Sequence, residues 1–366
     1  MTFSGTRLRI GRVFHGYTQR ELAGQIAVSN GLIAAFENGL KEPKHDILDA
    51  LCAVLEVESD YFSRPVTDEF LESQSNFRKR ISASDRLKKQ VLARASMFGM
   101  AVQHLQNFGN FPPLNFPSMP ARSLDEIEGI AEQCRLHWGL GIDAPIGDMA
   151  RVIENAGAVI LSLDLQTAEK VDAFSRFGDI SVVVLNSQKN SPSRTLFDMS
   201  HEVGHGVLHQ SGRDMPLQQR ETEADYFAGA FLMPRVAFAA DFTASHDSDW
   251  DGLLDMKTYW RASIQAILHR AYQLRLIDAV EYRNRFRTLG SWGWRTAEPN
   301  EPSVDQPSLF RKALARAFSD YGKTPLALAR ELGWTPTLFE KATGIPVPVG
   351  VVGRVLSLDS KRRVGA

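Results

Sequence analysis

Residues 197–209 read FDMSHEVGHGVLH, an apolar run that carries three histidines and one glutamate. In an α-helix, residues four apart lie on one face, with about 6 Å of rise between them. His201 and His205 are therefore expected to direct both imidazole rings at one metal ion. Glu202 stands about 100° further round the helix. It would then lie beside the metal, where a general base could take a proton from a metal-bound water.

The third histidine of this run does not fit the same ion. His209 lies about 12 Å along the helix axis from His201, so all three histidines cannot reach one metal. We expect His209 either to support a ligand from behind or to lie at the surface. Gly204 indicates that a neighbouring element or a substrate packs close to the helix. The alternative is a buried helix that carries paired histidines without binding a metal. It stays open because such a pentad occurs by chance in roughly one chain in a hundred.

A third ligand would distinguish these alternatives, since catalytic zinc sites use three protein ligands and leave one position for water. The stretch RETEADYFAGAFLMP, residues 220–234, follows at short range. Glu221 and Asp225 are again four apart, on a helix with an apolar face, where a carboxylate is costly without a cation or donor. Glu221 as a ligand, with Asp225 accepting a hydrogen bond from a ligand imidazole, satisfies both acids. Glu223 points elsewhere and is expected to face solvent.

The two stretches together resemble the ImmA/IrrE family of zinc-dependent metallo-endopeptidases. In that family a helix carrying H-E-x-x-H is followed by a helix carrying E-x-x-A-[ND]-x-F-A and ending in L-M-P, as in LFDMSHEVGHGVLH and ETEADYFAGAFLMP. The likeness covers roughly residues 120–300. It implies a zincin-like domain that hydrolyses peptide bonds with Zn²⁺ as cofactor. By this resemblance Glu202 is the catalytic glutamate, and the zinc ligands are His201, His205 and Glu221.

Residues 7–63 are predicted to form short helices separated by tight turns. Thr18 and Glu21 have the spacing of a capping box, and a further helix follows Ser29 and stops at Gly39. The stretch TQRELAGQIAVSNGLIAAFENG resembles the XRE-type helix-turn-helix family, the fold of phage repressors. In such domains the second helix crosses the phosphate backbone of double-stranded DNA, and the third enters the major groove.

The resemblance also implies which side chains meet the DNA. Gly31 and Ala35 are small where long polar side chains are common, so few hydrogen bonds to base edges are available. Up to residue 44 there are six basic residues and three acids, a balance that suits phosphate contact but is modest for tight binding. A helix-turn-helix fold used for dimerisation or protein docking is the alternative. The residues expected at the DNA are Gln19, Arg20, Ser29, Asn30, Gly31, Ala35 and Lys41.

The rest of the chain is predicted to be mainly helical. Residues 84–107 have the pattern of one amphipathic helix, which we expect to pack against the peptidase domain or a second subunit. Its basic residues, with Arg78 to Arg80 nearby, are expected to form a solvated face rather than a second nucleic-acid site. β-rich runs at 158–163 and 180–186 make the fold class mainly α with a small β-sheet, that is, α+β. The expected segments are a helix-turn-helix domain at 1–65, the amphipathic helix and a proline-rich linker at 66–121, the peptidase domain at 122–295 and a small helical C-terminal domain at 305–366.

Composition narrows the class of protein. Hydrophobic residues make up 43% and charged residues 23% of the 366 residues, as in soluble globular proteins. No apolar run approaches the roughly 18 residues of a membrane span, and the N-terminus has no signal-peptide core. Cys52 and Cys134 stand far apart, which fits a reducing cytoplasm and excludes a thiolate zinc cluster. The net charge of −1 means that nucleic-acid binding needs a local basic face.

These observations predict a cytoplasmic, DNA-binding transcriptional regulator with a zinc endopeptidase domain. The family resemblance suggests that the peptidase cleaves a repressor or antitoxin-like protein and so relieves repression. By analogy with other helix-turn-helix proteins, the expected assembly is a homodimer, with no membrane partner. One alternative is a sensor or repressor with little turnover, in which the peptidase fold is a protein-binding scaffold. Another is an antitoxin-like protein that recognises a single partner.

Overall fold

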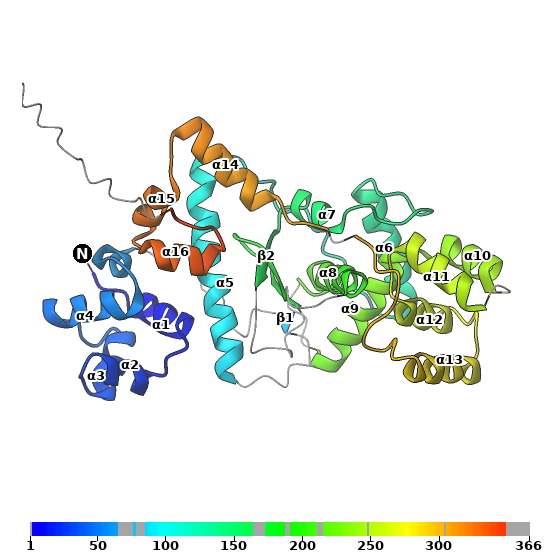
Figure 1. Ribbon diagram of the computed structural model, residues 1–366, viewed down its shortest axis with the longest axis horizontal. Coiled ribbons are helices and arrows are strands. Elements are labelled where there is room, and N and C mark those ends of the chain that lie inside the picture. The colour runs from blue at the N-terminus through cyan, green and yellow to red at the C-terminus, as the bar shows by residue number, and fades with distance from the viewer. Residues whose placement is uncertain are drawn as a thin grey trace, which may run out of the picture.

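A computed structural model shows an elongated molecule, with four short helices at one end, a small sheet in the middle and a group of helices at the other end (Figure 1). It describes residues 2–64, 76–77, 85–163, 173–186, 191–210, 215–246, 249–303 and 305–348. The expected basic residues Arg78 to Arg80 lie outside the described residues. None of the described helices is long and apolar enough to cross a membrane.

The N-terminal end forms the short helices that the turn signals predict. Thr18 and Glu21 make the reciprocal hydrogen bonds of a capping box, and the Ser29 hydroxyl accepts from the backbone N–H of Leu32. After the third helix, Gly39 adopts a φ of +69°, in the left-handed region that favours glycine. The elements are α1 (Gly5–Phe14), α2 (Gln19–Gln25), α3 (Asn30–Glu37), α4 (His45–Leu55) and the 3₁₀ turn η1 (Ser59–Ser63).

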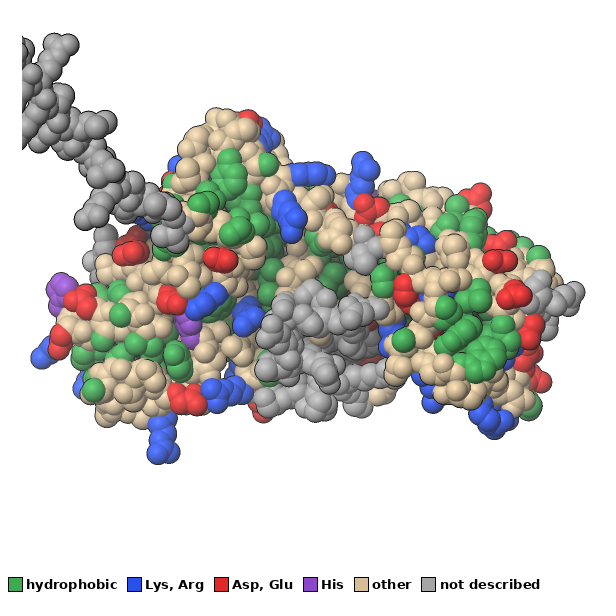
Figure 2. All heavy atoms as spheres, in the orientation of Figure 1, with side chains coloured by type: hydrophobic (Ala, Val, Ile, Leu, Met, Phe, Trp, Pro, Cys, Tyr) green, Lys and Arg blue, Asp and Glu red, His purple; other side chains and the backbone are tan. Residues whose placement is uncertain are grey.

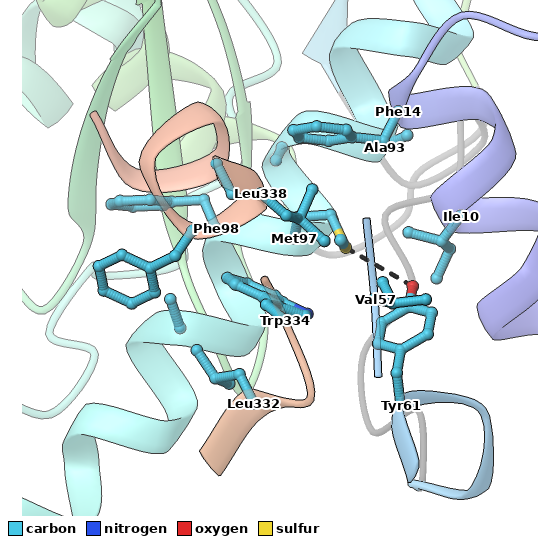
Figure 3. Packing of buried hydrophobic residues seen from close by; sticks show 14 of the residues in the cluster. Ile10, Phe14, Val57, Tyr61, Ala93, Met97, Phe98, Leu332, Trp334 and Leu338 are labelled. Carbon is cyan, nitrogen blue, oxygen red and sulfur yellow. Dashed lines mark hydrogen bonds between the residues drawn. The ribbon is translucent and has the colours of Figure 1, made fainter. Parts of the chain in front are cut away.

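The amphipathic helix, α5 (Asp85–Leu105), is sandwiched between two layers. On one side it packs against α1, and on the other against strands of the sheet and the C-terminal helices α14 (Leu309–Tyr321), α15 (Pro325–Leu332) and α16 (Pro336–Thr343). Figure 3 shows Met97 of α5 between Tyr61 and Trp334, with the Tyr61 hydroxyl 3.7 Å from the Met97 sulfur. Tyr61 and Trp334 are fully buried, and large aromatic side chains of this kind dominate the apolar contact area of a core. The N-terminal helices and helices α14, α15 and α16 are thus joined through α5 in one core.

The sheet separates this core from a second one. Its strands are β1 (Asn76–Phe77), β2 (Val159–Leu163), β3 (Ala173–Arg176) and β4 (Val182–Asn186), in the order β1-β3-β4-β2, with β2 and β4 parallel and β3 antiparallel to β4. Alternate residues of β4 face opposite cores: Val182 and Val184 lie in the core with α5, while Val183 and Leu185 lie in the second core. A strand covered on both faces needs a continuous apolar run, which is why both parallel strands were predictable.

The second core lies under the helices at the other end of the molecule. Helix α8 crosses β3 and β4, and α9 runs against α8. Beneath α9, the buried Arg270 donates to Glu128, which ties α12 to α6. The prediction of a mainly α fold with a small β-sheet is confirmed. The remaining elements are α6 (Leu124–His137), α7 (Met149–Asn155), α8 (Pro192–Leu208), α9 (Leu217–Leu232), α10 (Arg235–His246), α11 (Asp249–Trp260), α12 (Ile264–Gln273), α13 (Ala279–Ser291) and the turn η3 (Gln106–Phe108).

Candidate metal centre and nucleic-acid interface

The closeness of α8 and α9 brings the metal-ligand candidates together. A Cβ atom on Gly204 would lie 3.1 Å from the ring of Phe227 and 3.3 Å from Cα of Ala224. A side chain at this position would require α9 to shift by a few tenths of an ångström, so glycine favours the close approach. Of the two explanations for this glycine, a neighbouring element is therefore the one observed. The approach places Glu221, on the first turns of α9, opposite the two histidines of α8.

Three potential ligand atoms converge in this space. Nε2 of His201 and Nε2 of His205 are 3.0 Å apart, and the carboxylate oxygens of Glu221 lie 3.7 Å from the first and 3.4 Å from the second. All three side chains are buried, and their ligand atoms lie within 4.8 Å of one another. Ligands at 2.0–2.1 Å around a tetrahedral zinc ion are separated by roughly 3.4 Å. Two imidazoles and one carboxylate at these distances fit Zn²⁺ with its fourth position open.

Asp225 supports the first histidine. Its carboxylate oxygen Oδ1 lies 2.9 Å from Nδ1 of His201. A metal bound by Nε2 of His201 would require the ring proton to be on Nδ1, from which it would be donated to Asp225. This contact fixes the tautomer and the ring orientation that metal binding requires. Asp225 thus lies in contact with the imidazole of His201, a candidate metal ligand.

The second histidine is supported by a longer chain of hydrogen bonds. Nδ1 of His205 lies 2.9 Å from Nδ1 of His209, and Nε2 of His209 lies 3.2 Å from a carboxylate oxygen of Glu223. The other oxygen of Glu223 accepts from the Gln219 amide at 2.8 Å. Burial lowers the pKa of His209 to about 4, so the ring is neutral at pH 7. With Nε2 of His205 bound to a metal, His205 would donate to His209, and His209 would donate to Glu223.

One sequence-based expectation about the residues of this hydrogen-bond network is wrong. Glu223 was expected to face solvent, yet it is only 7% exposed and paired with His209. The reason is that His209, at the C-terminal end of α8, and Gln219 cover this side of α9 and form hydrogen bonds with the Glu223 carboxylate. Gln219 was not anticipated at all, although it lies four residues before Glu223, the spacing of neighbours on one helix face.

Glu202 is buried beside the metal position, with 1% of its surface exposed. Burial raises the pKa of its carboxyl group to about 7, and the nearby carboxylates of Glu221 and Asp198 add to the shift. A carboxyl group with a pKa close to neutrality can both take up and release a proton at pH 7. Asp198, one helical turn before Glu202, was not anticipated, because it looked like an ordinary polar residue near the start of the helix.

Five of the seven expected DNA-contacting residues, Gln19, Arg20, Ser29, Asn30 and Gly31, lie at the N-termini of α2 and α3. Asn30 and Gly31 are exposed on the first turn of α3, and no described atom lies within 4 Å of a Cβ built on Gly31. The Ser29 hydroxyl is engaged in capping α3, whereas Ala35, further along, is half-buried. Arg20 and Lys41 are exposed on the same end of the molecule.

Gln19 belongs to a buried polar network. Its amide donates to Oε2 of Glu37 at 2.8 Å, and Glu37 also accepts from Nε and NH2 of Arg12 at 2.6 and 2.9 Å. A bidentate pair of this kind fixes both side chains. The network therefore holds the start of α2 against α1 and the end of α3, which sets the orientation of the exposed face.

Comparison with known protein families agrees with this geometry. Residues 153–272 match the family model described as the IrrE N-terminal-like domain, a peptidase family, and residues 8–62 match the helix-turn-helix family model. The chain joins a helix-turn-helix domain to an IrrE-like domain. This confirms the fusion expected from the sequence. No curated protein matches the chain.

The two matches fall on the two sites described above. The IrrE-like domain includes α8 and α9 with all three metal-ligand candidates, and the helix-turn-helix domain extends from α1 to η1. Together the domains are those of a DNA-binding regulator that carries a protease-like domain.

Proposed function

We propose that the chain is a transcriptional regulator whose IrrE-like domain is a zinc-dependent endopeptidase. The observation that carries this proposal is the convergence of His201, His205 and Glu221 next to the buried Glu202. A purely structural helix pair would have no reason to gather four ionisable groups in an apolar interior, where each is costly unless it is paired or bound to a cation. When bound there, Zn²⁺ would polarise the scissile carbonyl and lower the pKa of water.

The protein's own residues would then act in fixed roles. Glu202 takes a proton from the attacking water on its carboxylate and returns it to the departing amine, which its pKa near 7 permits. Asp225 and the His209–Glu223 pair hold the two ligand imidazoles by their Nδ1 atoms. Helices α8 and α9 exclude bulk water from the site, since Glu202 and the ligands are almost fully buried.

The proposed substrate is a repressor or antitoxin-like protein, and its cleavage would relieve transcriptional repression. The support for this substrate is the resemblance to the ImmA/IrrE family together with the attached helix-turn-helix domain. We place the regulator in the cytoplasm, where such a substrate and DNA are both present. The segments proposed for these roles are residues 1–65 for DNA binding, 66–121 as connector, 122–295 for the peptidase and 305–366 as a helical C-terminal domain.

The peptidase proposal is tested with the Glu202→Gln variant. The full-length chain, loaded with Zn²⁺, is incubated with the repressor encoded by a neighbouring gene, and fragments are identified by mass spectrometry. Wild-type protein should produce defined fragments, whereas Glu202→Gln should retain zinc and produce none. If target-gene regulation in cells is the same with Glu202→Gln as with wild type, the domain acts as a sensor or scaffold and the peptidase proposal is wrong.

We also propose that the helix-turn-helix domain binds double-stranded DNA, as part of a homodimer. The support is the exposure of Asn30, Gly31 and Arg20 around the two helix N-termini that face DNA in this fold. The test is retention of DNA from the region upstream of its own gene, with Arg20→Ala as the variant. Binding should weaken with Arg20→Ala and with added salt. Absence of binding by wild-type protein at low salt would assign this domain to protein docking.

A further inference from the structure

A groove runs between the helix-turn-helix domain and the start of α5. It encloses about 710 Å³ and is lined on one side by residues of α1 and α2 and by Asn30 of α3, and on the other by Arg86, Lys89 and apolar residues of α5. Gln19 and Arg20, two of the residues expected at the DNA, belong to the same lining. The groove therefore opens beside the surface proposed to face DNA.

The position of α5 in this groove is fixed by hydrogen bonds. The Arg86 guanidinium donates to the Gly16 carbonyl at 3.0 and 2.6 Å and to the carboxylate of Glu21 at 3.1 and 3.2 Å. One turn further, the Gln90 amide donates to the Phe14 carbonyl at 3.2 Å. These bonds attach the first turns of α5 to the turn between α1 and α2. These hydrogen bonds consequently fix the position of Lys89 relative to the start of α2.

The charge of the groove is of one sign. Five of its lining residues are basic, and none is acidic. Two of the five are neutralised by neighbours, since Arg12 pairs with Glu37 and Arg86 with Glu21. Lys89 is exposed, and no ion-pair partner is found for it among the residues that the structure describes. A basic groove of this kind attracts a polyanion.

From this arrangement we infer that α5 extends the DNA-binding surface, with Lys89 contacting a backbone phosphate beside those bound by the helix-turn-helix domain. The inference rests on the proposed DNA binding. In this fold the DNA backbone passes the N-terminus of the second helix, and in this chain α5 lies next to that point. On this inference Lys89 belongs neither to a separate nucleic-acid site nor to a face that contacts only solvent. Figure 2 shows Lys and Arg side chains around the junction of the N-terminal helices with α5.

A lost phosphate contact has a defined signature. Each phosphate neutralised by a lysine releases counterions and adds about 0.9 to the slope of log K against log salt concentration. Removing one such contact should therefore reduce the slope by about 1 and weaken binding uniformly across DNA sequences. At ~0.15 M salt this amounts to about five-fold in affinity. A helix that only braces the domain would leave the slope unchanged.

The experiment compares full-length wild type with Lys89→Gln by fluorescence anisotropy, using labelled DNA from the region upstream of the gene at several KCl concentrations. Lys89→Gln keeps most of the side-chain length and, being exposed, should not affect folding, which thermal melts verify. The matched control is Arg283→Gln, an exposed arginine on α13 at the far end of the molecule. We expect a shallower salt slope and about five-fold weaker binding for Lys89→Gln, and no change for Arg283→Gln.

The possible results distinguish this inference from the proposed DNA binding on which it rests. If wild type binds DNA and Lys89→Gln has the same salt slope and affinity as wild type, the role of α5 is wrong. The helix-turn-helix domain would then be the DNA-binding unit. Equal losses in Lys89→Gln and Arg283→Gln would also overturn it, because only the total charge would then matter. If wild type binds no DNA even at low salt, both the inference and the proposed DNA binding are wrong.

Discussion

Replacing His209 by alanine should weaken zinc binding although His209 is not itself a ligand. The substitution removes the acceptor that lies 2.9 Å from Nδ1 of His205, so that His205 is free to rotate and to carry its proton on the nitrogen that must bind the metal. Loss of such a supporting contact typically costs 10–100-fold in metal affinity, which corresponds to about 1.4–2.8 kcal/mol.

The same substitution has a second effect on folding that must be separated from the first. It leaves the carboxylate of Glu223 buried without its imidazole donor, although Gln219 still donates to the other oxygen. An unsatisfied buried acceptor costs about 1–3 kcal/mol. In the double variant His209→Ala/Glu223→Gln the leftover charge is gone, so the stability of the metal-free protein should recover while zinc affinity stays low.

Zinc affinity is measured by competition with a chelating dye, and the free energy of unfolding of the metal-free protein by urea denaturation. His209→Asn is the rescue variant, because its amide oxygen can take the place of Nδ1 as acceptor. His137→Ala removes an exposed histidine elsewhere in the domain and should leave zinc affinity unchanged. Wild-type zinc affinity in His209→Ala would refute the role of this hydrogen-bond chain. So would an equal loss in the alanine and asparagine variants.

Three further predictions concern folding and reactivity. Glu37→Ala leaves Arg12 buried without its bidentate partner and should lower the free energy of unfolding by about 3–5 kcal/mol. A urea-denaturation midpoint near that of wild type would argue against a structural role for the Arg12–Glu37 pair. Gly5→Ala places a Cβ 2.3 Å from the backbone oxygen of Glu37, so α1 must move away from α3 and the melting temperature should fall by several degrees. Burial raises the pKa of Cys52 to about 11 and of Cys134 to about 12, so thiolate is scarce at pH 8. An aromatic disulfide reagent should therefore label both cysteines only after unfolding. Rapid labelling of the native chain would contradict this prediction.

The elements that could be predicted from sequence depend on local spacing. His201 and His205 share a helix face whatever surrounds the helix, and the Thr18 capping box needs only residues three apart. Strands β2 and β4 were predictable because burial on both faces requires uninterrupted apolar residues. In contrast, β3 is four residues long and contains Ser175 and Arg176, so neither a continuous apolar run nor a long alternation identified it.

What the sequence could not provide was the relation between distant elements. The amphipathic stripe of α5 predicted one packing face, but α5 buries most of its circumference because it lies between two layers. Its contact with Trp334 joins residues more than two hundred positions apart, and no periodicity identifies such a partner. Glu223 was misplaced for the same reason, since its environment depends on the angle at which α9 meets α8.

The most direct test of the metal centre is the zinc content of the full-length chain, purified without chelator and measured by inductively coupled plasma mass spectrometry. The proposed zinc site predicts about one zinc per wild-type chain, the same content in Glu202→Gln, and little or none in His201→Ala. Zinc-free wild-type protein that also fails to take up added zinc would contradict it, and so would a His201→Ala variant that keeps a full complement of zinc.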